Sequence, residues 1–370
     1  MNFKNLDLIQ PIIEAIDKAG YTQATEIQLK SIPIILSGND IIGCAQTGTG
    51  KTAAFAIPII QNLEKSPIKA QVIRTLILTP TRELALQINE NFDIYKGNLK
   101  LTNIAVFGGV PAKPQINALR KGVDILIATP GRLLDLISQG FINIKQIEIL
   151  VLDEADRMLD MGFVNDIKKI LKLVPQKRQT LFFSATMPDS IRKFSQTILK
   201  NPKEINVSPV SSTSDSVTQS LYFVEKNEKE ALLIRILLDQ ENKRTLVFTR
   251  TKHLANKLIK KLDQAGIKSA AIHGNKSQSA RQRALDDFKA NIITVLVATD
   301  IAARGIDIDE LSFVINFELP NVPETYVHRI GRTGRGGNFG KAISFCSKDE
   351  RSDLMGIQKL IGFKIPVNEI

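Results

Sequence analysis

Short runs of apolar, β-prone residues recur along the chain, and each run ends in a small or polar residue. Segments with the helical period of apolar residues separate most of these runs, for example at 82–95 and 279–290. Apolar strands that alternate with helices are typical of parallel sheets covered by helices on both faces. We therefore predict an α/β fold. Its expected strands lie at 40–45, 75–81, 123–130, 147–156, 180–186, 245–251, 269–274, 294–300 and 313–319.

A serine-rich segment separates the first five expected strands from the last four. It spans 208–220 and reads SPVSSTSDSVTQS, with six serines and two threonines among thirteen residues. This composition is typical of a flexible linker between domains. A chain of 370 residues is also too long for one ordinary hydrophobic core. We predict one domain at 1–207, the linker at 208–220 and a second domain at 221–370.

The two halves of the chain resemble each other. Residues 75–85 (TLILTPTRELA) and 245–255 (TLVFTRTKHLA) are identical at six of eleven positions. A weaker echo pairs ILIATP at 125–130 with VLVATD at 295–300. Two unrelated strand–turn–helix units could share such patterns, but a duplicated α/β domain explains better why both matches fall at corresponding places. Ligands bind at the carboxyl ends of strands in open parallel sheets, and the polar motifs lie there.

The composition is that of a soluble globular protein, with 43% apolar and 24% charged residues. No apolar run approaches the roughly 18 residues of a membrane span. Asp7 interrupts the first apolar stretch, so we expect no signal peptide. Cys44 and Cys346 lie 302 positions apart, which argues against a disulfide framework and a zinc cluster. We expect a monomeric, cytoplasmic protein without a membrane partner.

The net charge of +11 is spread over both halves, with +6 up to residue 210 and +5 beyond it. A polyanionic partner such as nucleic acid would explain this basic excess. A charge that serves solubility would explain it equally well. Charge alone therefore selects no function.

The stretch CAQTGTGKT nearly fits the phosphate-binding pattern G-x-x-x-x-G-K-[ST], with Ala45 at the first glycine position. Gly48 and Gly50 permit close approach of the backbone to a phosphate. Lys51 would contact the β and γ phosphates, and Thr52 a metal ion. A glycine turn with a solvated lysine is the alternative. The preceding strand and the following helix favour the phosphate loop.

Two carboxylates follow a second apolar strand, in ILVLDEAD. Asp153 would hold Mg²⁺, and Glu154 would polarise the attacking water. An acidic helix start would also explain two carboxylates. It would not explain their place directly after a buried strand, so with Lys51 in the same sheet we favour the catalytic interpretation.

A third motif, HRIGRTGRGG, places Arg332 and Arg335 three positions apart, on one face if the segment is helical. Guanidinium groups suit multidentate contact with phosphate oxygens. A flexible Arg/Gly loop that touches solvent or RNA is the alternative, and His328 taken alone is better explained as a structural hydrogen-bonding residue. Together the three motifs predict nucleoside triphosphate hydrolysis, with the phosphate loop in one domain and the arginines in the other.

Eight short motifs stand in order along the chain: AQTGTGKT, PTRELA, GG, TPGR, DEAD, SAT, ARGID and HRIGRTGR. This ordered set resembles the DEAD-box RNA helicases, and the segment HRIGRTGRGGNFGKAISF looks closest to their bacterial RhlE-like branch. The resemblance covers residues 3 to about 350. It implies two tandem RecA-like parallel-sheet domains joined by a flexible linker, ATP and Mg²⁺ as cofactors, and RNA as a partner.

The resemblance implies a role for each matching residue. Tyr21 would stack on adenine and Gln28 would hydrogen-bond its edge, while Phe3 resembles the family's upstream aromatic residue. Ala45 is what this family normally carries at the start of its phosphate loop. The implied nucleotide contacts are Tyr21, Gln28, Ala45, Gln46, Thr47, Gly48, Thr49, Gly50, Lys51, Thr52, Gly305 and Asp307. The implied catalytic residues are Lys51, Asp153, Glu154, Arg332 and Arg335, with Thr52 and Asp153 at the metal. The residues implied to couple nucleotide state to strand separation are Ser184, Thr186, Asp156 and His328.

RNA contacts are implied in both domains. They are Pro80, Thr81, Arg82, Gly108, Gly109, Thr129, Gly131 and Arg132 in the first, and Arg250, Gln278, Arg281, Thr299 and Asp300 in the second. The chain has no Trp and only four Tyr, so few base-stacking platforms are available. We therefore expect RNA, single-stranded or duplex, to be bound along its sugar–phosphate backbone without sequence specificity.

Our hypothesis is an ATP-dependent RNA helicase that unwinds short duplexes locally when ATP and RNA close the cleft between its domains. An ATP-gated RNA clamp or scaffold in ribosome assembly or RNA decay needs the same motifs and stays an alternative. A DNA-directed ATPase is a third possibility. Ala24 and Glu26 stand where many family members carry proline or a small residue, which puts adenine selectivity in question.

Overall fold

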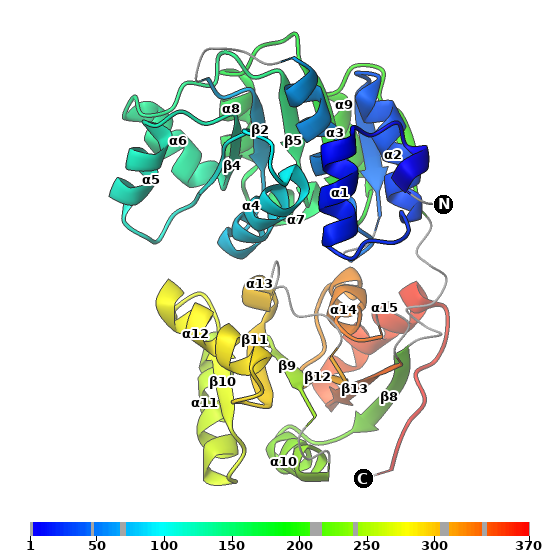
Figure 1. Ribbon diagram of the computed structural model, residues 1–370. Coiled ribbons are helices and arrows are strands. Elements are labelled where there is room, and N and C mark those ends of the chain that lie inside the picture. The colour runs from blue at the N-terminus through cyan, green and yellow to red at the C-terminus, as the bar shows by residue number, and fades with distance from the viewer. Residues whose placement is uncertain are drawn as a thin grey trace. The chain divides into compact units, whose positions relative to one another are not determined.

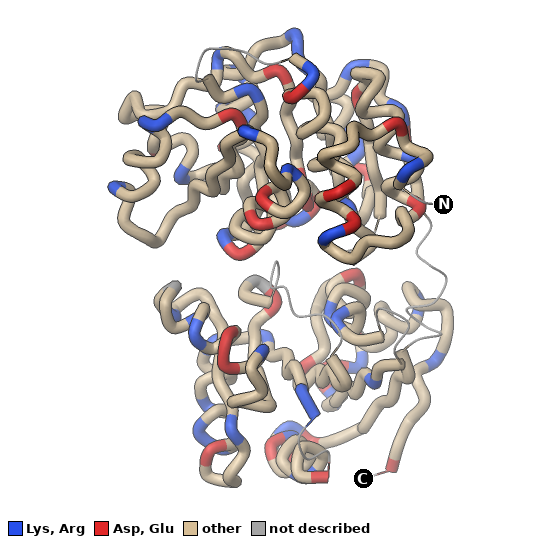
Figure 2. Tube along the Cα trace, in the orientation of Figure 1, with Lys and Arg blue, Asp and Glu red and all other residues tan. Residues whose placement is uncertain are grey.

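The computed structural model describes residues 3–45, 48–66, 72–207, 217–239, 243–303, 311–334 and 339–369. The chain divides into two compact units, Met1–Pro209 and Val210–Ile370, and each is described by itself. Within the described ranges no helix is long and apolar enough to cross a membrane. Figure 2 shows Lys and Arg along both units with Asp and Glu among them, as the even division of net charge predicts.

The first unit is built on a parallel sheet (Figure 1). Among the described residues its order is β3-β4-β2-β5-β6-β1-β7, and every recorded strand pair is parallel. The strands are β1 (Ile41–Cys44), β2 (Thr75–Leu78), β3 (Asn103–Val106), β4 (Ile125–Ala128), β5 (Ile149–Leu152), β6 (Gln179–Ser184) and β7 (Lys203–Asn206). The helices are α1 (Gln10–Lys18), α2 (Glu26–Leu36), α3 (Lys51–Lys65), α4 (Arg82–Lys96), α5 (Ala112–Leu119), α6 (Pro130–Ser138), α7 (Ala155–Asp160), α8 (Val164–Leu171) and α9 (Asp189–Gln196), after a 3₁₀ turn at Phe3–Asn5.

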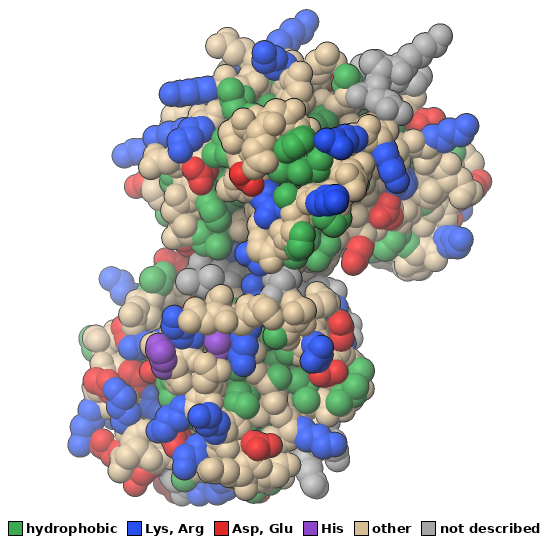
Figure 3. Space-filling view, turned by 90° about the vertical axis from the view of Figure 1, so that its left-hand side faces the viewer, with side chains coloured by type: hydrophobic (Ala, Val, Ile, Leu, Met, Phe, Trp, Pro, Cys, Tyr) green, Lys and Arg blue, Asp and Glu red, His purple; other side chains and the backbone are tan. Residues whose placement is uncertain are grey.

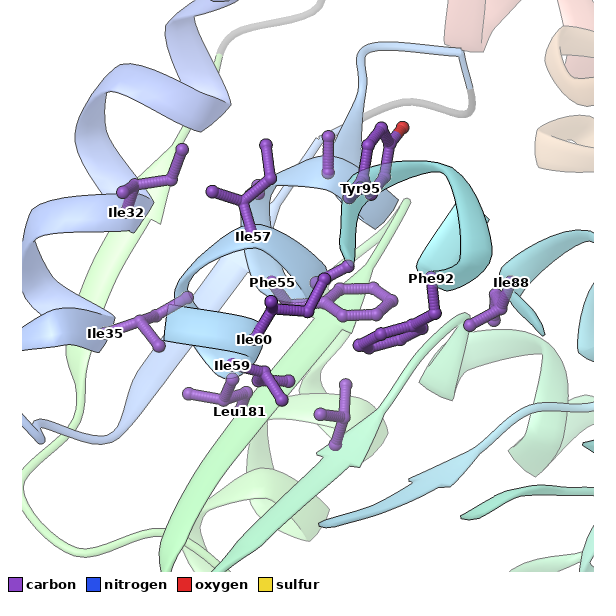
Figure 4. Packing of buried hydrophobic residues seen from close by; sticks show 14 of the residues in the cluster. Ile32, Ile35, Phe55, Ile57, Ile59, Ile60, Ile88, Phe92, Tyr95 and Leu181 are labelled. Atoms are coloured by element: carbon purple, nitrogen blue, oxygen red, sulfur yellow. The ribbon is translucent and has the colours of Figure 1, made fainter. Parts of the chain in front are cut away.

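Both faces of this sheet are buried, because successive side chains of a strand point to opposite faces. In β5, Ile149 and Val151 join the core under α1, α2, α3 and α4, while Leu150 and Leu152 join the core under α6, α7, α8 and α9. Figure 4 shows the first core, where Phe55 of α3 lies between the sheet and Phe92 of α4. The predicted sheet covered on both faces is confirmed for this unit.

The second unit repeats this plan with the order β10-β11-β9-β12-β13-β8, and its recorded pairs are parallel. The strands are β8 (Val217–Phe223), β9 (Thr245–Thr249), β10 (Ser269–Ile272), β11 (Val295–Thr299), β12 (Phe313–Asn316) and β13 (Gly340–Cys346). The helices are α10 (Lys229–Asp239), α11 (Lys252–Gln264), α12 (Gln278–Lys289), α13 (Asp300–Ala303), α14 (Pro323–Ile330) and α15 (Arg351–Ile361), with a 3₁₀ turn at Lys348–Glu350. Helices α10 and α11 cover one face, and α12 and α13 the other.

The two sequence echoes occupy equal ranks in the two sheets. Strands β2 and β9 are each third from the edge, and β4 and β11 are each second. A threonine also caps the helix that follows β2 and the helix that follows β9. The Thr81 hydroxyl accepts from Leu84 N at 3.3 Å, and the Thr251 hydroxyl accepts from Leu254 N at 3.2 Å. This agreement in topology and capping supports the duplication that the sequence predicts.

One sequence prediction needs correction. Residues 217–220, assigned to the linker, form the first part of β8, where Val217 and Leu221 are buried against β13. Polar residues occupy alternate positions of this strand, so the segment resembles a linker in composition although it is half-buried. Residues 208–216 lie outside the described part of the chain.

Candidate functional site

The phosphate loop of the first unit joins β1 to α3. Gly48 and Gly50 have φ of 85° and 87°, left-handed values that glycine adopts without strain. Gly50 caps α3, and Lys51 is the first residue of the helix, so free backbone N–H groups point out of the helix start. Lys51 Nζ donates to Ala45 O at 2.5 Å, across the loop. Gln46 and Thr47 lie outside the described residues.

The predicted carboxylates follow β5, which lies beside β6 and two positions from β1 in the sheet. Asp153 is 2% exposed and Glu154 is 4% exposed. Glu154 has φ of 52° and caps α7, a left-handed conformation that is strained for a residue with a side chain. The alternative interpretation of the two carboxylates, an acidic helix start, therefore also describes their position. Asp153 directly follows β5, and Glu154 directly precedes α7.

Charges of both signs are buried together at this edge. Burial and, to a smaller extent, the negative charge of Glu154 raise the pKa of Asp153 to about 7, while the ammonium of Lys51 acts in the opposite direction. Burial lowers the pKa of Lys51, although Asp153 and Glu154 both favour its charged form. An additional cation at this point would stabilise ionised Asp153.

The loop after β6 is hydrogen-bonded to Asp156 of α7. Asp156 Oδ2 accepts hydrogen bonds from the backbone N of Thr186 at 3.0 Å and from its hydroxyl at 2.9 Å. Ser184 Oγ donates to Thr186 O at 2.7 Å, and Ser184 O accepts from Ala45 N at 3.1 Å. Three of the four residues predicted to couple nucleotide state, Ser184, Thr186 and Asp156, thus form one hydrogen-bonded path from the phosphate loop to α7. The fourth, His328, lies in α14 of the second unit.

Arg157, which the sequence analysis did not select, contacts a predicted catalytic residue. Its Nη1 lies 2.5 Å from Glu154 Oε2, and both side chains are buried. One turn of α7 brings these two positions together. The ion pair holds the Glu154 carboxylate in place, and the only sequence signal was an arginine directly after the acidic motif.

The predicted adenine contacts lie near the phosphate loop. Gln28 Oε1 accepts from Thr25 N at 2.9 Å, as in a helix capping box, and Gln28 Nε2 donates to Gly50 O at 3.2 Å. A Cβ at position 50 would overlap the Gln28 amide, so a glycine is required there. Tyr21 is 38% exposed, and its ring packs edge-on to Tyr95. Phe3 is buried in the core instead of lying open to a base.

Most of the predicted RNA contacts of the first unit gather at the carboxyl ends of β2, β3 and β4. The Arg82 guanidinium occupies the space that a Cβ of Gly109 would fill. Arg132 Nη2 donates to Val110 O at 3.0 Å, while Arg132 Nη1 is buried without a hydrogen-bond partner. Thr129 N donates to Val106 O at 3.0 Å. The other members of this group are Pro80, Thr81 and Gly108, which lie between a strand and the next helix, and Gly131, the second residue of α6.

In the second unit, two of the predicted RNA contacts are engaged within the protein. Arg250 donates to Leu319 O and to Asp353 Oδ2, each at 2.6 Å. Asp300 is held by Arg329 in a bidentate ion pair with distances of 2.6 and 2.7 Å. Arg329 is 1% exposed and joins α14 to the ends of β11 and β12, a role that the sequence did not reveal.

A basic group surrounds the end of β10. The pKa of His273 is lowered by burial and by the positive charges of Lys276 and Lys252, and the predicted RNA contact Arg281 acts in the same direction. Figure 3 shows histidines among Lys and Arg side chains on one face of this unit. Thr299 ends β11, and Gln278 starts α12 with a side chain outside the described part.

The segment of the predicted arginines is not helical at Arg332, so the condition for a shared helix face is not met there. Helix α14 ends at Ile330, and Gly331 follows it, so Arg332 lies beyond the helix and is 5% exposed. A glycine at this point favours helix termination. His328 is half-buried in the last turn of α14. Arg335, Gly305 and Asp307 lie outside the described residues.

The fold and the site define a class of protein. Two parallel-sheet α/β units, the first with a phosphate loop and paired carboxylates at the carboxyl edge of its sheet, are typical of nucleoside triphosphatases with tandem RecA-like domains.

Comparison with known proteins identifies the family. The chain matches the DEAD/DEAH box helicase family over residues 25–194 and the helicase conserved C-terminal domain over residues 228–337. It is 42% identical to the DEAD-box ATP-dependent RNA helicase RhpA of Helicobacter pylori, covering 100% of this chain and 74% of that protein. It is 43% identical to the DEAD-box ATP-dependent RNA helicase CshA of Geobacillus kaustophilus, covering 96% of this chain and 76% of that protein.

A solved structure agrees with this assignment. Dbp5 of S. cerevisiae bound to RNA and ADP BeF3 superposes with a TM-score of 0.88 at 30% identity, covering 100% of this chain and 95% of that chain. The protein belongs to the DEAD-box ATP-dependent RNA helicases. Its assignment to the RhlE-like branch stays a prediction.

Proposed function

We propose that the protein is a DEAD-box helicase that separates short RNA duplexes locally, with ATP and single-stranded RNA bound across both domains. The observation that carries this proposal is the buried group formed by Lys51, Asp153 and Glu154, with Asp156 hydrogen-bonded to Thr186. It combines a phosphate-binding cation, two acidic side chains and a physical link to a neighbouring loop, as a nucleotide-driven switch requires.

Mg²⁺ fits the donors of this site. Among the described residues no group of three or more His, Cys, Asp or Glu could hold a metal by itself. Mg²⁺ in phosphoryl-transfer sites needs only one or two carboxylates, with substrate oxygens and water as its other ligands. The donors we propose are the Thr52 hydroxyl and Asp153, a carboxylate whose pKa burial and Glu154 raise in spite of the Lys51 ammonium. The ion would neutralise phosphate charge.

Different residues of the chain then have different roles in ATP hydrolysis. Lys51 contacts phosphate oxygens, and Glu154 accepts a hydrogen bond from the attacking water and orients it. Arg157 holds the Glu154 carboxylate through the 2.5 Å ion pair. Arg332 and Arg335 of the second domain complete the charge stabilisation when the domains close, and Gly305 and Asp307 add nucleotide contacts.

Closure requires that both ligands bind the closed form more tightly than the open form. Moving a two-state equilibrium from 1:99 to 99:1 takes about 10⁴-fold preferential binding, which ATP and RNA can divide between them. Hydrolysis removes part of this preference, so the domains reopen and release RNA. One helicase cycle therefore opens only a short stretch of duplex.

The test compares ATP hydrolysis with and without single-stranded RNA, and strand separation of a short and a long RNA duplex at equal ATP. We expect RNA to stimulate hydrolysis, DNA to stimulate it weakly, and the short duplex to be separated faster. Equal stimulation by DNA would favour a DNA-directed ATPase. Stimulation without separation of either duplex would favour the ATP-gated clamp.

Adenine selectivity gives a second test. A glutamine amide offers two donors and two acceptor sites, and Gln28 uses one of each on Gly50 and Thr25. The remaining donor and acceptor match N7 and N6 of adenine, whereas guanine presents two acceptors at the same edge. A donor to N7 serves both purines, so the acceptor that meets N6 makes the distinction. Gln28→Met keeps the length of the side chain and removes its donors and acceptors. We expect it to lower the ATP-over-GTP preference in kcat/KM by about 10- to 100-fold.

The ratio of the two substrates is the informative quantity, because loss of the Gly50 contact would affect both equally. An unchanged ATP-over-GTP ratio would remove Gln28 from adenine recognition. Tyr21→Ala serves as the companion variant: loss of stacking should weaken both nucleotides and leave the ratio nearly unchanged. Protein partners in ribosome assembly or RNA decay, a monomeric state and a cytoplasmic location stay predictions.

A further inference from the structure

Helix α5 has one buried residue among those described, and that residue is polar. Gln115 is 8% exposed, while the rest of the helix is half-buried or exposed. A surface helix normally buries an apolar stripe, and a buried amide must find hydrogen-bond partners. Gln115 finds both on one residue: its Oε1 accepts from Phe107 N at 3.2 Å, and its Nε2 donates to Phe107 O at 3.1 Å.

Phe107 directly follows β3, the outermost strand of the first sheet. Val106 O accepts from Thr129 N on the side of β4. Because the N–H and C=O groups of successive residues in a strand point to opposite sides, those of Phe107 point to the open edge. The Gln115 amide occupies this edge and supplies the donor and the acceptor that a further strand would supply.

The residues that follow Phe107 are fixed as well. Gly109 has φ of 79°, and the Arg82 guanidinium fills the space beside its Cα. Val110 O accepts from Arg132 Nη2 at 3.0 Å. Side chains from α4, α5 and α6 therefore hold segment 107–110 at three points. Where the segment leaves the strand, Gln115 holds the backbone of Phe107, and burial in the first core holds its ring.

We propose that Gln115 is a positioning residue for RNA binding, which sets the direction of the backbone N–H groups of Gly108 and Gly109 toward a phosphate of the RNA. This inference rests on the proposed function, in which those two glycines contact RNA. Gln115 acts through the loop and touches neither RNA nor ATP. Its loss should therefore weaken RNA binding while hydrolysis at saturating RNA continues.

The experiment uses the full chain and the variant Gln115→Met, which keeps the length and apolar volume of the side chain and removes both hydrogen bonds. Gln139→Met is the matched control, because Gln139 is the exposed C-cap of α6 and its side chain donates to Asp135 Oδ1 on the same helix. Four quantities are measured: amide hydrogen exchange of residues 103–119, the oligouridylate concentration that half-saturates ATP hydrolysis, and kcat and the KM for ATP.

For Gln115→Met we expect faster exchange at 107–110 and an RNA half-saturation concentration raised about 10-fold, with kcat and the KM for ATP within about 2-fold of wild type. The control should match wild type in all four quantities. Unchanged exchange together with unchanged half-saturation would overturn the proposal, as would an equal fall in kcat. If Gln115→Met does not fold, Gln115→Glu keeps the Phe107 N–H contact and loses only the other, and the same criteria apply.

The hydrogen-exchange measurement and the RNA titration together distinguish failure of this inference from failure of the proposed function. Faster exchange with an unchanged RNA half-saturation would overturn the RNA contact of Gly108 and Gly109, and the positioning role with it. Absence of RNA stimulation in the wild type would refute the proposed function. That result would hold whatever hydrogen exchange shows about the two hydrogen bonds between Gln115 and Phe107.

Discussion

Replacing Glu154 by glutamine should lower kcat for RNA-stimulated ATP hydrolysis by about 10²- to 10⁴-fold, the usual contribution of a general base. Gln fills the same space and still presents an oxygen to Arg157 Nη1, so the local structure should persist. It lacks the negative charge that draws a proton from water. ATP and RNA should bind together and remain bound, because the step that releases them is blocked.

Single-turnover hydrolysis measures the chemical step, and RNA retention in the presence of ATP measures the trapped complex. Glu64→Gln is a suitable control, since Glu64 is exposed near the end of α3 and lies outside the proposed site. Normal single-turnover hydrolysis by the Glu154 variant would reject the base assignment. A variant that binds neither ligand would show instead that Glu154 supports the structure of the site.

The central strands were predictable because parallel strands buried on both faces are continuously apolar. Strands β2, β4, β5, β9 and β11 all have this character. The missed strands β3, β7 and β8 lie at edges of their sheets, and the side chains of β3 and β7 are mostly half-buried or exposed, so their sequences do not carry the same pattern. Strand β13 was missed although it lies inside its sheet, because Lys341 and Ser344 interrupt its apolar run.

The location of the site was also predictable, because the carboxyl ends of parallel strands share one edge. The partners of its side chains were not. The bond from Gln28 to Gly50 and the ion pair of Asp300 with Arg329 join residues 22 and 29 positions apart. Residue type and spacing do not specify such pairings, which depend on how helices dock on the sheet. The spacing of the two arginines also did not indicate that α14 ends before Arg332, with Gly331 as its C-cap.

Lys51 should be the most sensitive residue of the phosphate loop. Lys51 is 7% exposed, and the charges of Asp153, Glu154 and Asp156 favour its ammonium form against the effect of burial on its pKa. Lys51→Ala removes the one loop cation available to the phosphates. We expect kcat to fall by about 10²- to 10³-fold, as when one stabilising group is lost from a buried transition-state site, and the KM for ATP to rise.

A second consequence follows from the charges that remain. Without Lys51 the buried carboxylates keep only Arg157 as a neighbouring cation, so the pKa of Asp153 should rise beyond about 7 and its ionised form should become rarer. Metal binding would then weaken together with phosphate binding. Added Mg²⁺ should therefore restore part of the ATP affinity of the variant, whereas in wild type the same increase should have little effect.

Lys65→Ala is the matched control, because Lys65 is the exposed last residue of the same helix. ATP titrations of hydrolysis at two Mg²⁺ concentrations, with saturating RNA, measure kcat, KM and their dependence on the metal. Hydrolysis by Lys51→Ala within about 2-fold of wild type would show that the loop amides alone hold the phosphates. A lower kcat without any Mg²⁺ dependence would place the effect of Lys51 on the phosphates and leave Asp153 independent of it.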